Sequence, residues 1–150
     1  MLILSIYGRV STKDDEDTSS ESVKRIDVMA DTISITKEVY LRDKLSQETI
    51  IYQETFTIAD ISKISILQGN ETYGPNVTVI YFRCKSGNCV SMDKTRTRES
   101  KVSGVKVEKK SAKFANDDLL IADKTQAEKI LQAFKHLFAL RGWQEKHDLF

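Results

Sequence analysis

The segment TQAEKILQAFKHLFALR, residues 125–141, is the part of the sequence from which the fold is inferred. Six apolar residues recur in it at the spacing of one helix face: Ala127, Ile130, Leu131, Phe134, Leu137 and Phe138. Thr125 and Glu128 have the spacing of a capping box, and Asp123 offers an alternative N-cap. Gly142 suits the position that follows the last helical turn. The pattern predicts a terminal amphipathic helix whose apolar face covers the open end of a sheet.

Upstream of this helix, apolar and polar residues alternate as they do in half-buried β-strands. The alternation runs through residues 23–36, with a turn at Ala30 and Asp31, and residues 39–41 continue it. A helix over residues 37–45 is the alternative, but the β-branched and aromatic residues in that stretch favour a strand. We therefore predict strands throughout this part of the chain.

The next stretches also have strand and turn patterns. Residues 49–58, TIIYQETFTI, have one apolar face and one wetter face, and residues 59–60 then shift the phase as a bulge or sheet corner would. Residues 68–76 hold the only proline and two of the six glycines, which predicts a turn. Residues 77–84, VTVIYFRC, are apolar on both faces, as in a central strand. A last short strand is expected at residues 118–122.

Cys84 and Cys89 enclose the turn sequence Lys-Ser-Gly-Asn. This spacing predicts a hairpin in which residues 89–92 return antiparallel to the strand at residues 77–84, and such a pair can form a disulfide in an oxidising compartment. A zinc site is disfavoured because it needs about four ligands, and neither His136 nor His147 has a partner at ligand spacing. A redox-active pair is disfavoured because the C-x-x-C spacing is missing. We interpret the cysteines as a structural thiol pair, and predict neither a metal site nor a cofactor.

Residues 93–113 are strongly basic: eight bases oppose three acids, a net charge of +5 in a chain whose total is +1. Because it contains no core residues, this segment is predicted to be either a protruding loop or a functional insertion. No aromatic residue is interleaved for base stacking, so nucleic acid is not an expected partner. Lys94, Arg96 and Arg98 occupy alternate positions and would share one face of an extended chain, facing an acidic or phosphate-rich surface. Together with Lys101 they are the candidate anion-binding residues.

The N-terminal region has a different composition. Residues 12–22 contain five acids, one base and no apolar side chain, which predicts a flexible acidic linker. The domain is therefore expected to span residues 23–142, after an N-terminal region at residues 1–22 and before a tail at residues 143–150. The apolar start, MLILSIY, lacks the basic region of a signal peptide. We expect a cytoplasmic protein if Met1 is the true start, and an exported, periplasmic one if an upstream signal segment is missing.

The sequence contains no recognisable catalytic constellation. His136 flanks the apolar helix stripe, and His147 lies in a polar stretch without a partner to orient it. Asp117 and Asp118 are adjacent, so in an extended chain their side chains point to opposite faces and do not form an acid–base pair. Glycine-rich phosphate loops, serine elbows and zinc-binding helix motifs are absent. We therefore predict that the protein is not an enzyme.

The strand pattern over residues 23–92, followed by one terminal amphipathic helix, resembles the pleckstrin-homology-like superfold. The stretch TFTIADISKISIL, residues 55–67, is similar to a strand and following turn in such domains. The resemblance implies a mainly β fold: a bent antiparallel sheet or small barrel of about seven strands, capped by the C-terminal helix. The phosphoinositide site of that family is not carried over, because acidic residues interrupt the corresponding basic cluster. A helix-grip fold with a ligand cavity is the main alternative, and the cysteine hairpin with its helix also resembles small bacterial proteins of unknown function.

These features lead to the hypothesis of a non-catalytic interaction module. It would recognise a protein or peptide through an exposed strand edge. One alternative is binding to anionic phospholipid headgroups through the basic loop at residues 93–113. A second alternative is a small-ligand carrier of the helix-grip type.

Overall fold

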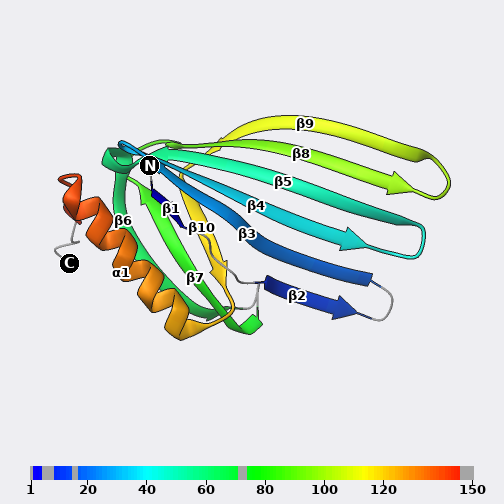
Figure 1. Ribbon diagram of the computed structural model, residues 1–150, viewed down its shortest axis with the longest axis horizontal. Coiled ribbons are helices and arrows are strands. Elements are labelled where there is room, and N and C mark those ends of the chain that lie inside the picture. The colour runs from blue at the N-terminus through cyan, green and yellow to red at the C-terminus, as the bar shows by residue number, and fades with distance from the viewer. Residues whose placement is uncertain (1, 5–8, 15–16, 71–73, 146–150) are drawn as a thin grey trace.

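The computed structural model describes residues 2–4, 9–14, 17–70 and 74–145, with side chains described for residues 19–67 and 77–145. This part of the chain forms ten strands, one short 3-10 turn and one helix (Figure 1). In chain order they are β1 (Leu2–Leu4), β2 (Arg9–Asp14), β3 (Asp17–Met29), β4 (Thr32–Arg42), β5 (Ser46–Thr57), η1 (Ile58–Asp60), β6 (Ile61–Asn70), β7 (Gly74–Cys84), β8 (Val90–Ser100), β9 (Gly104–Phe114), β10 (Asn116–Ile121) and α1 (Lys124–Leu140).

The strands form two sheets in which every neighbouring pair is antiparallel. The long sheet has the order β1-β3-β4-β5-β8-β9, with β2 also paired to β3, and the short sheet has the order β10-β7-β6. Among the described residues the long sheet is open rather than closed into a barrel. The prediction of a mainly β fold with a bent antiparallel sheet and a C-terminal helix is confirmed, although the described strands number ten rather than about seven.

The alternation of apolar and polar residues explains which side chains are buried in the half of the long sheet that lies near α1. In β4, Ile33 and Ile35 are fully buried, whereas the residues between and beside them are half-buried. Ala30 adopts a φ of +51° in the turn that joins β3 to β4, where a turn was predicted. The alternative helix over residues 37–45 is wrong, because residues 37–42 pair with β5 as the end of β4. The described part of the chain therefore lacks the additional helix that a helix-grip fold requires.

The predicted sheet corner lies at η1. Ile58 is buried there, and its backbone N–H donates to the carbonyl of Asp31 at 2.7 Å. The chain leaves the long sheet at the end of β5 and enters the short sheet at β6, whose register shifts between Ile61 and Lys63. A change in the phase of apolar alternation therefore marked a change of sheet.

The helix α1 lies against the short sheet with the predicted stripe inward: Ala127, Leu131, Phe134 and Phe138 are buried. Its N-cap is Asp123, whose carboxylate accepts from the backbone N–H groups of Thr125 and Gln126. The capping box with Thr125 as the cap is therefore not formed, and the alternative cap is the correct one. Gly142 follows the last turn with a φ of +82°, as predicted.

One hydrophobic core joins both sheets and α1. Phe82 of β7 is its centre, with ring centroids 5.1 Å from Phe56 of the long sheet and 5.1 Å from Phe134 of α1. Beyond the helix, Trp143 packs edge-on against Phe138, and its Nε1 donates to the Ile61 carbonyl at 2.6 Å. The helix is therefore a lid that closes the space between two antiparallel sheets, as expected from the stripe.

The long sheet continues well past this core (Figure 1). We call the extension the arm and define it as residues 37–52 and 93–111, which belong to β4, β5, β8 and β9 and to their connecting turns. In Figure 1 the arm projects to the right, beyond β10 and α1, and ends in two hairpin turns. The basic stretch at residues 93–113 is thus the β8–β9 hairpin, and the prediction of a loop is wrong. Backbone hydrogen bonds between β8 and β9 keep this hairpin extended, although β9 buries little apolar surface.

Two other predictions differ from the structure. Residues 89–92 do not return along β7, because β8 pairs with β5 and β9 in the other sheet. Of residues 12–22, expected to form a flexible linker, residues 12–14 belong to β2 and residues 17–22 begin β3, where residues 18–22 pair with β4. β8 and β5 are far apart in the sequence, so local residue patterns do not reveal their pairing. β3 and β4 are consecutive strands, and the polar end of β3 is held by backbone pairing rather than by apolar burial.

Candidate interaction surface

The strand β9 is the free edge of the arm. Within the described residues it pairs with β8 alone, and ten of its eleven residues are exposed. Its sequence, GVKVEKKSAKF, contains four lysines and one glutamate. An edge strand of this kind has backbone N–H and C=O groups directed away from its only partner. Those groups are available to pair with another extended chain.

The two faces of β9 differ in chemistry. Val105 and Val107 alternate on the outer face of the arm and are exposed. Lys106, Glu108 and Lys110 alternate on the inner face, which is continuous with the face that carries the core. The other two lysines of β9 continue the outer face, so an added strand would meet two lysines on each face, with the two valines at the turn end of the outer face.

The candidate anion-binding residues Lys94, Arg96 and Arg98 share the inner face of β8, as their spacing predicted. We call these three residues the basic row. Their cross-strand partners in β5 are Tyr52, Ile50 and Glu48, in that order. The surroundings of the row, rather than its formal charge, decide what it can bind.

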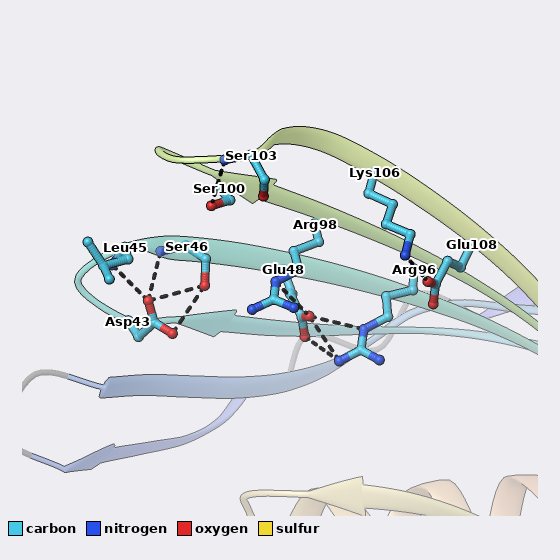
Figure 2. Close-up of polar contacts among 10 residues, drawn as sticks. All are labelled: Asp43, Leu45, Ser46, Glu48, Arg96, Arg98, Ser100, Ser103, Lys106 and Glu108. Carbon is cyan, nitrogen blue, oxygen red and sulfur yellow. Dashed lines mark hydrogen bonds and ion pairs between the residues drawn. The ribbon is translucent and has the colours of Figure 1, made fainter.

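Glu48 neutralises much of the basic row (Figure 2). Arg96 donates from Nε to Glu48 Oε1 at 3.1 Å and from Nη2 to Oε2 at 2.9 Å, while Arg98 Nε lies 3.6 Å from Oε1. This hydrogen bonding and charge attraction raise the pKa of the Arg96 guanidinium. The Glu48 side chain is only 10% exposed but that of Arg96 is 40% exposed, so the ion pair is partly open to solvent. A small cleft of about 70 Å³ lies among these side chains and those of Lys106 and Glu108.

The other two candidate anion-binding residues, Lys94 and Lys101, lie in different surroundings. Lys94 Nζ lies 5.6 Å from the centroid of the Tyr52 ring, in cation–π contact. Lys101 is in the turn between β8 and β9, where its backbone N–H donates to the Leu45 carbonyl at 2.9 Å. The structure thus brings three of the four predicted residues together and places the fourth at the end of the arm.

A buried charge cluster lies where the arm meets the core, and sequence reasoning missed it. Lys37 of β4 is 4% exposed at its side chain and forms ion pairs with carboxylates from both sheets. Its Nζ lies 2.7 Å from Glu54 Oε2, 3.2 Å from Asp117 Oδ1 and 3.1 Å from Asp118 Oδ1. Glu54 belongs to β5 and the two aspartates to β10. The cluster therefore ties the short sheet to the long sheet by charge.

The environment of the cluster perturbs its ionisation. Burial opposes the charged form of Lys37, but attraction to Asp117, Glu54 and Asp118 outweighs it and holds the lysine pKa above its usual value. Burial, followed by hydrogen bonding to Asp117, raises the pKa of Glu54 to about 8. Asp117 Oδ2 is buried without a hydrogen-bond donor among the described residues. The raised pKa favours the protonated form of Glu54, whose carboxyl group can donate a hydrogen bond to Asp117.

A signal for this cluster was present in the sequence. Lys37 follows Ile33 and Ile35 on the inward face of β4, and Glu54 lies between Tyr52 and Phe56 on the apolar face of β5. A polar residue on an apolar face is a candidate for a buried pair. Which carboxylates meet the lysine depends on β10, which is about 80 residues away in sequence.

The structural thiol pair forms a disulfide between Cys84 and Cys89. Cys84 ends β7, and the intervening residues carry the chain to the beginning of β8, with Gly87 at a φ of +59°. The Cys84 backbone N–H donates to the carbonyl of Ala115 at 3.0 Å. The bridge therefore fixes the point at which the chain crosses from the short sheet to the long sheet.

The sequence also contains two histidines that were weighed as candidate catalytic or metal-binding residues. His136 is exposed on α1, and His147 lies outside the described residues. In the described ranges, no group of three or more histidine, cysteine or carboxylate side chains is arranged to hold a metal ion. The helix found in that part of the chain is too short and too polar to cross a membrane.

The comparisons with known proteins identify no relative. No family model, curated protein or solved structure matches the chain.

Proposed function

We propose that the protein binds an extended, acidic segment of a partner protein, which adds to β9 as a further strand. The observation that supports this function is the exposure of β9 on both faces together with its unpaired outer edge. Main-chain hydrogen bonds to such an edge provide affinity, and alternating side chains provide specificity. The arm covers little of the core, and its exposed strands are therefore open to a partner.

The charge of β9 indicates the chemistry of the partner. Four lysines against one glutamate repel a second copy of the same edge, which is how natural edge strands avoid self-association. The same charge attracts a strand that carries carboxylates. The edge therefore disfavours copies of itself and favours an acidic partner.

The two faces of β9 specify the partner further. An added strand that matches all of β9 has eleven residues and spans about 36 Å. Carboxylates on its inner face would lie opposite Lys106 and Lys110, and apolar side chains on its outer face would lie beside Val105 and Val107. A segment in which acidic and apolar residues alternate satisfies both requirements along the half of β9 that begins at Gly104, and carboxylates farther along its outer face would meet the other two lysines of β9.

Amide hydrogen exchange tests this mode of binding. The probe is an eleven-residue peptide in which glutamate and valine alternate, titrated at low salt and followed by NMR. We expect every second backbone amide of β9 to gain protection, because alternate residues of an edge strand direct their N–H groups outward. Absence of binding, or protection without this alternation, would overturn the proposal.

A charge-reversal pair provides the matched control. Lys106→Glu with Lys110→Glu is expected to weaken peptide binding about tenfold, because two favourable cross-strand pairs become repulsive. Lys124→Glu with Lys129→Glu makes the same change in net charge on exposed positions of α1. Equal loss in both variants would show that only total charge matters, and would exclude a strand-specific site.

The basic row is not favoured as an anionic-surface site, because Glu48 already occupies its two arginines. Binding of sulfated polysaccharide rather than peptide would instead support that alternative function.

A further inference from the structure

The end of the arm brings together two turns from distant parts of the sequence. Residues 43–45 join β4 to β5, and residues 101–103 join β8 to β9. The backbone N–H of Lys101 donates to the Leu45 carbonyl at 2.9 Å, so the two turns are directly bonded. We call residues 42–47 and 99–105 the tip.

Each turn of the tip is fixed by its own side chains (Figure 2). Asp43 Oδ1 accepts from the backbone N–H groups of Leu45 at 2.8 Å and Ser46 at 2.7 Å. Ser100 Oγ accepts from the backbone N–H groups of Val102 at 3.2 Å and Ser103 at 3.3 Å. The carboxylate of Asp43 is thus engaged within its turn, and these hydrogen bonds hold its pKa below the usual value. The tip is a preorganised surface.

The tip exposes apolar side chains that no element of the fold covers. Val102 is 82% exposed and Leu45 is 60% exposed, one in each turn. Four of the eight large apolar side chains exposed in the described residues belong to this end of the arm: Leu45, Val102, Val105 and Val107. Apolar residues gathered in this way mark a docking surface more often than scattered ones do.

Basic residues surround these apolar side chains. Arg42, Lys44 and Lys101 line a hollow of about 710 Å³ between the two turns. Of the two acids that also line it, Asp43 is bonded to its own turn and Glu99 accepts from Gln47 Nε2. The hollow therefore presents basic side chains beside Leu45, and Val102 follows Lys101 in the β8–β9 turn.

We propose that the tip docks onto an anionic lipid bilayer, with Leu45 and Val102 entering the headgroup boundary and the basic residues contacting lipid phosphates. Exposed apolar side chains flanked by bases are the chemistry of interfacial membrane binding. The tip lies at the far end of the arm from α1 (Figure 1), so a flat surface can reach it without meeting the core. This inference goes beyond the proposed peptide site, which uses the edge of β9 rather than the two turns.

Vesicle co-sedimentation tests the docking. The vesicles contain either phosphatidylcholine alone or equal parts of phosphatidylcholine and phosphatidylserine, at low and at high salt. We expect the protein to bind the mixed vesicles and to be released by salt, because screening weakens its attraction to the charged surface. Failure to bind the mixed vesicles at low salt would overturn the proposal.

Paired variants separate insertion from charge attraction. Leu45→Ser with Val102→Ser is expected to reduce binding to the mixed vesicles at least about tenfold, because two apolar side chains no longer leave water. Met29→Ser with Leu140→Ser is the control, since these residues are 61% and 68% exposed away from the tip. An equal loss in the control pair would contradict docking by the tip.

A fluorescent reporter distinguishes a bilayer from a free anion. In Val102→Trp, an indole at the tip is expected to shift its emission to shorter wavelength on mixed vesicles and not with inorganic phosphate. A shift of equal size with inorganic phosphate would show a phosphate site without membrane insertion, and would overturn the proposal. Binding of the acidic peptide to β9 is expected to be unchanged in the Leu45→Ser, Val102→Ser protein, so the two proposals fail independently.

Discussion

The strands β4, β5 and β8 pass through two environments, the core near α1 and the arm. Near α1 their inward residues, such as Ile35, Phe56 and Val90, are almost fully buried. In the arm the same face carries Glu48, Arg96 and other charged side chains that pair with one another. The Lys37 cluster marks the boundary between the two environments.

The two environments contribute differently to stability. In the core, each large apolar side chain contributes about 1.5–3 kcal/mol through burial. In the arm, backbone pairing and partly exposed ion pairs maintain the strands, and such ion pairs contribute about 0–1 kcal/mol each. Substitutions in the arm can therefore change binding at little cost in stability, which is why both proposed sites lie there.

The largest expected effect is in the core. Phe82→Ala removes the ring that contacts Phe56, Phe134 and Phe138, and we expect a loss of about 3–5 kcal/mol in the free energy of unfolding. Val107→Ala, on the exposed face of β9, is expected to change it by less than about 0.5 kcal/mol. Urea denaturation measures both values. Similar losses at the two positions would show that the arm is as important to stability as the core.

The boundary cluster is expected to be nearly as sensitive. Lys37→Met removes the only cation that contacts Glu54, Asp117 and Asp118 in the described residues, and leaves carboxylates buried without a counter-charge. We expect a loss of about 3 kcal/mol in the free energy of unfolding. Adding Asp117→Asn to this variant should restore part of that loss. Denaturation curves that coincide with the wild type would mean that the cluster contributes nothing to joining the sheets.

The pH dependence of stability is expected to depend on Glu54. Its pKa is 4.5 when unperturbed and about 8 in the folded protein, so between these values the folded state binds more protons than the unfolded state. The free energy of unfolding must therefore fall as pH rises through that window. Glu54→Gln keeps a hydrogen-bond donor for Asp117 but cannot ionise. We expect it to remove a decrease on the order of 2 kcal/mol, measured by urea denaturation from about pH 5 to about pH 8.

A decrease in Glu54→Gln that is as large as in the wild type, or larger, would contradict this assignment. Glu21 contributes in the same direction, because burial also raises the pKa of its carboxyl group. Glu21→Gln is therefore a useful companion variant, with a smaller expected change.

The smallest expected effect on stability is in the arm. Glu48→Gln should change the free energy of unfolding by less than about 1 kcal/mol. It should nevertheless increase retention on heparin at low salt, because Arg96 and Arg98 lose their counter-charge. Further replacement of Lys94, Arg96 and Arg98 by glutamine should abolish the gain. Unchanged retention in Glu48→Gln would show that the basic row was never masked by Glu48.

The core half of the fold could be predicted from the sequence. The helix stripe, the turn at Ala30 and the corner at residues 58–60 each follow from side-chain periodicity or turn chemistry within a few residues.

The candidate site was predicted less well than the core. The spacing of Lys94, Arg96 and Arg98 predicted their shared face, but it contained no information about Glu48, which is about 48 residues from Arg96. Adjacent Asp117 and Asp118 were predicted to point to opposite faces, yet both carboxylates reach Lys37.

For the segments that pack in the core, the sequence by itself determined which are strands or helix and which of their faces turn inward, because burial of apolar side chains follows the period of each element. Only the tertiary structure decided which strands are neighbours: that β8 joins β5 rather than β7, and that the turns with Leu45 and Val102 meet. Strand pairing is made by backbone groups that every residue shares. In the exposed arm, where no core selects a partner, residue types therefore do not encode the pairing in a form that can be read locally.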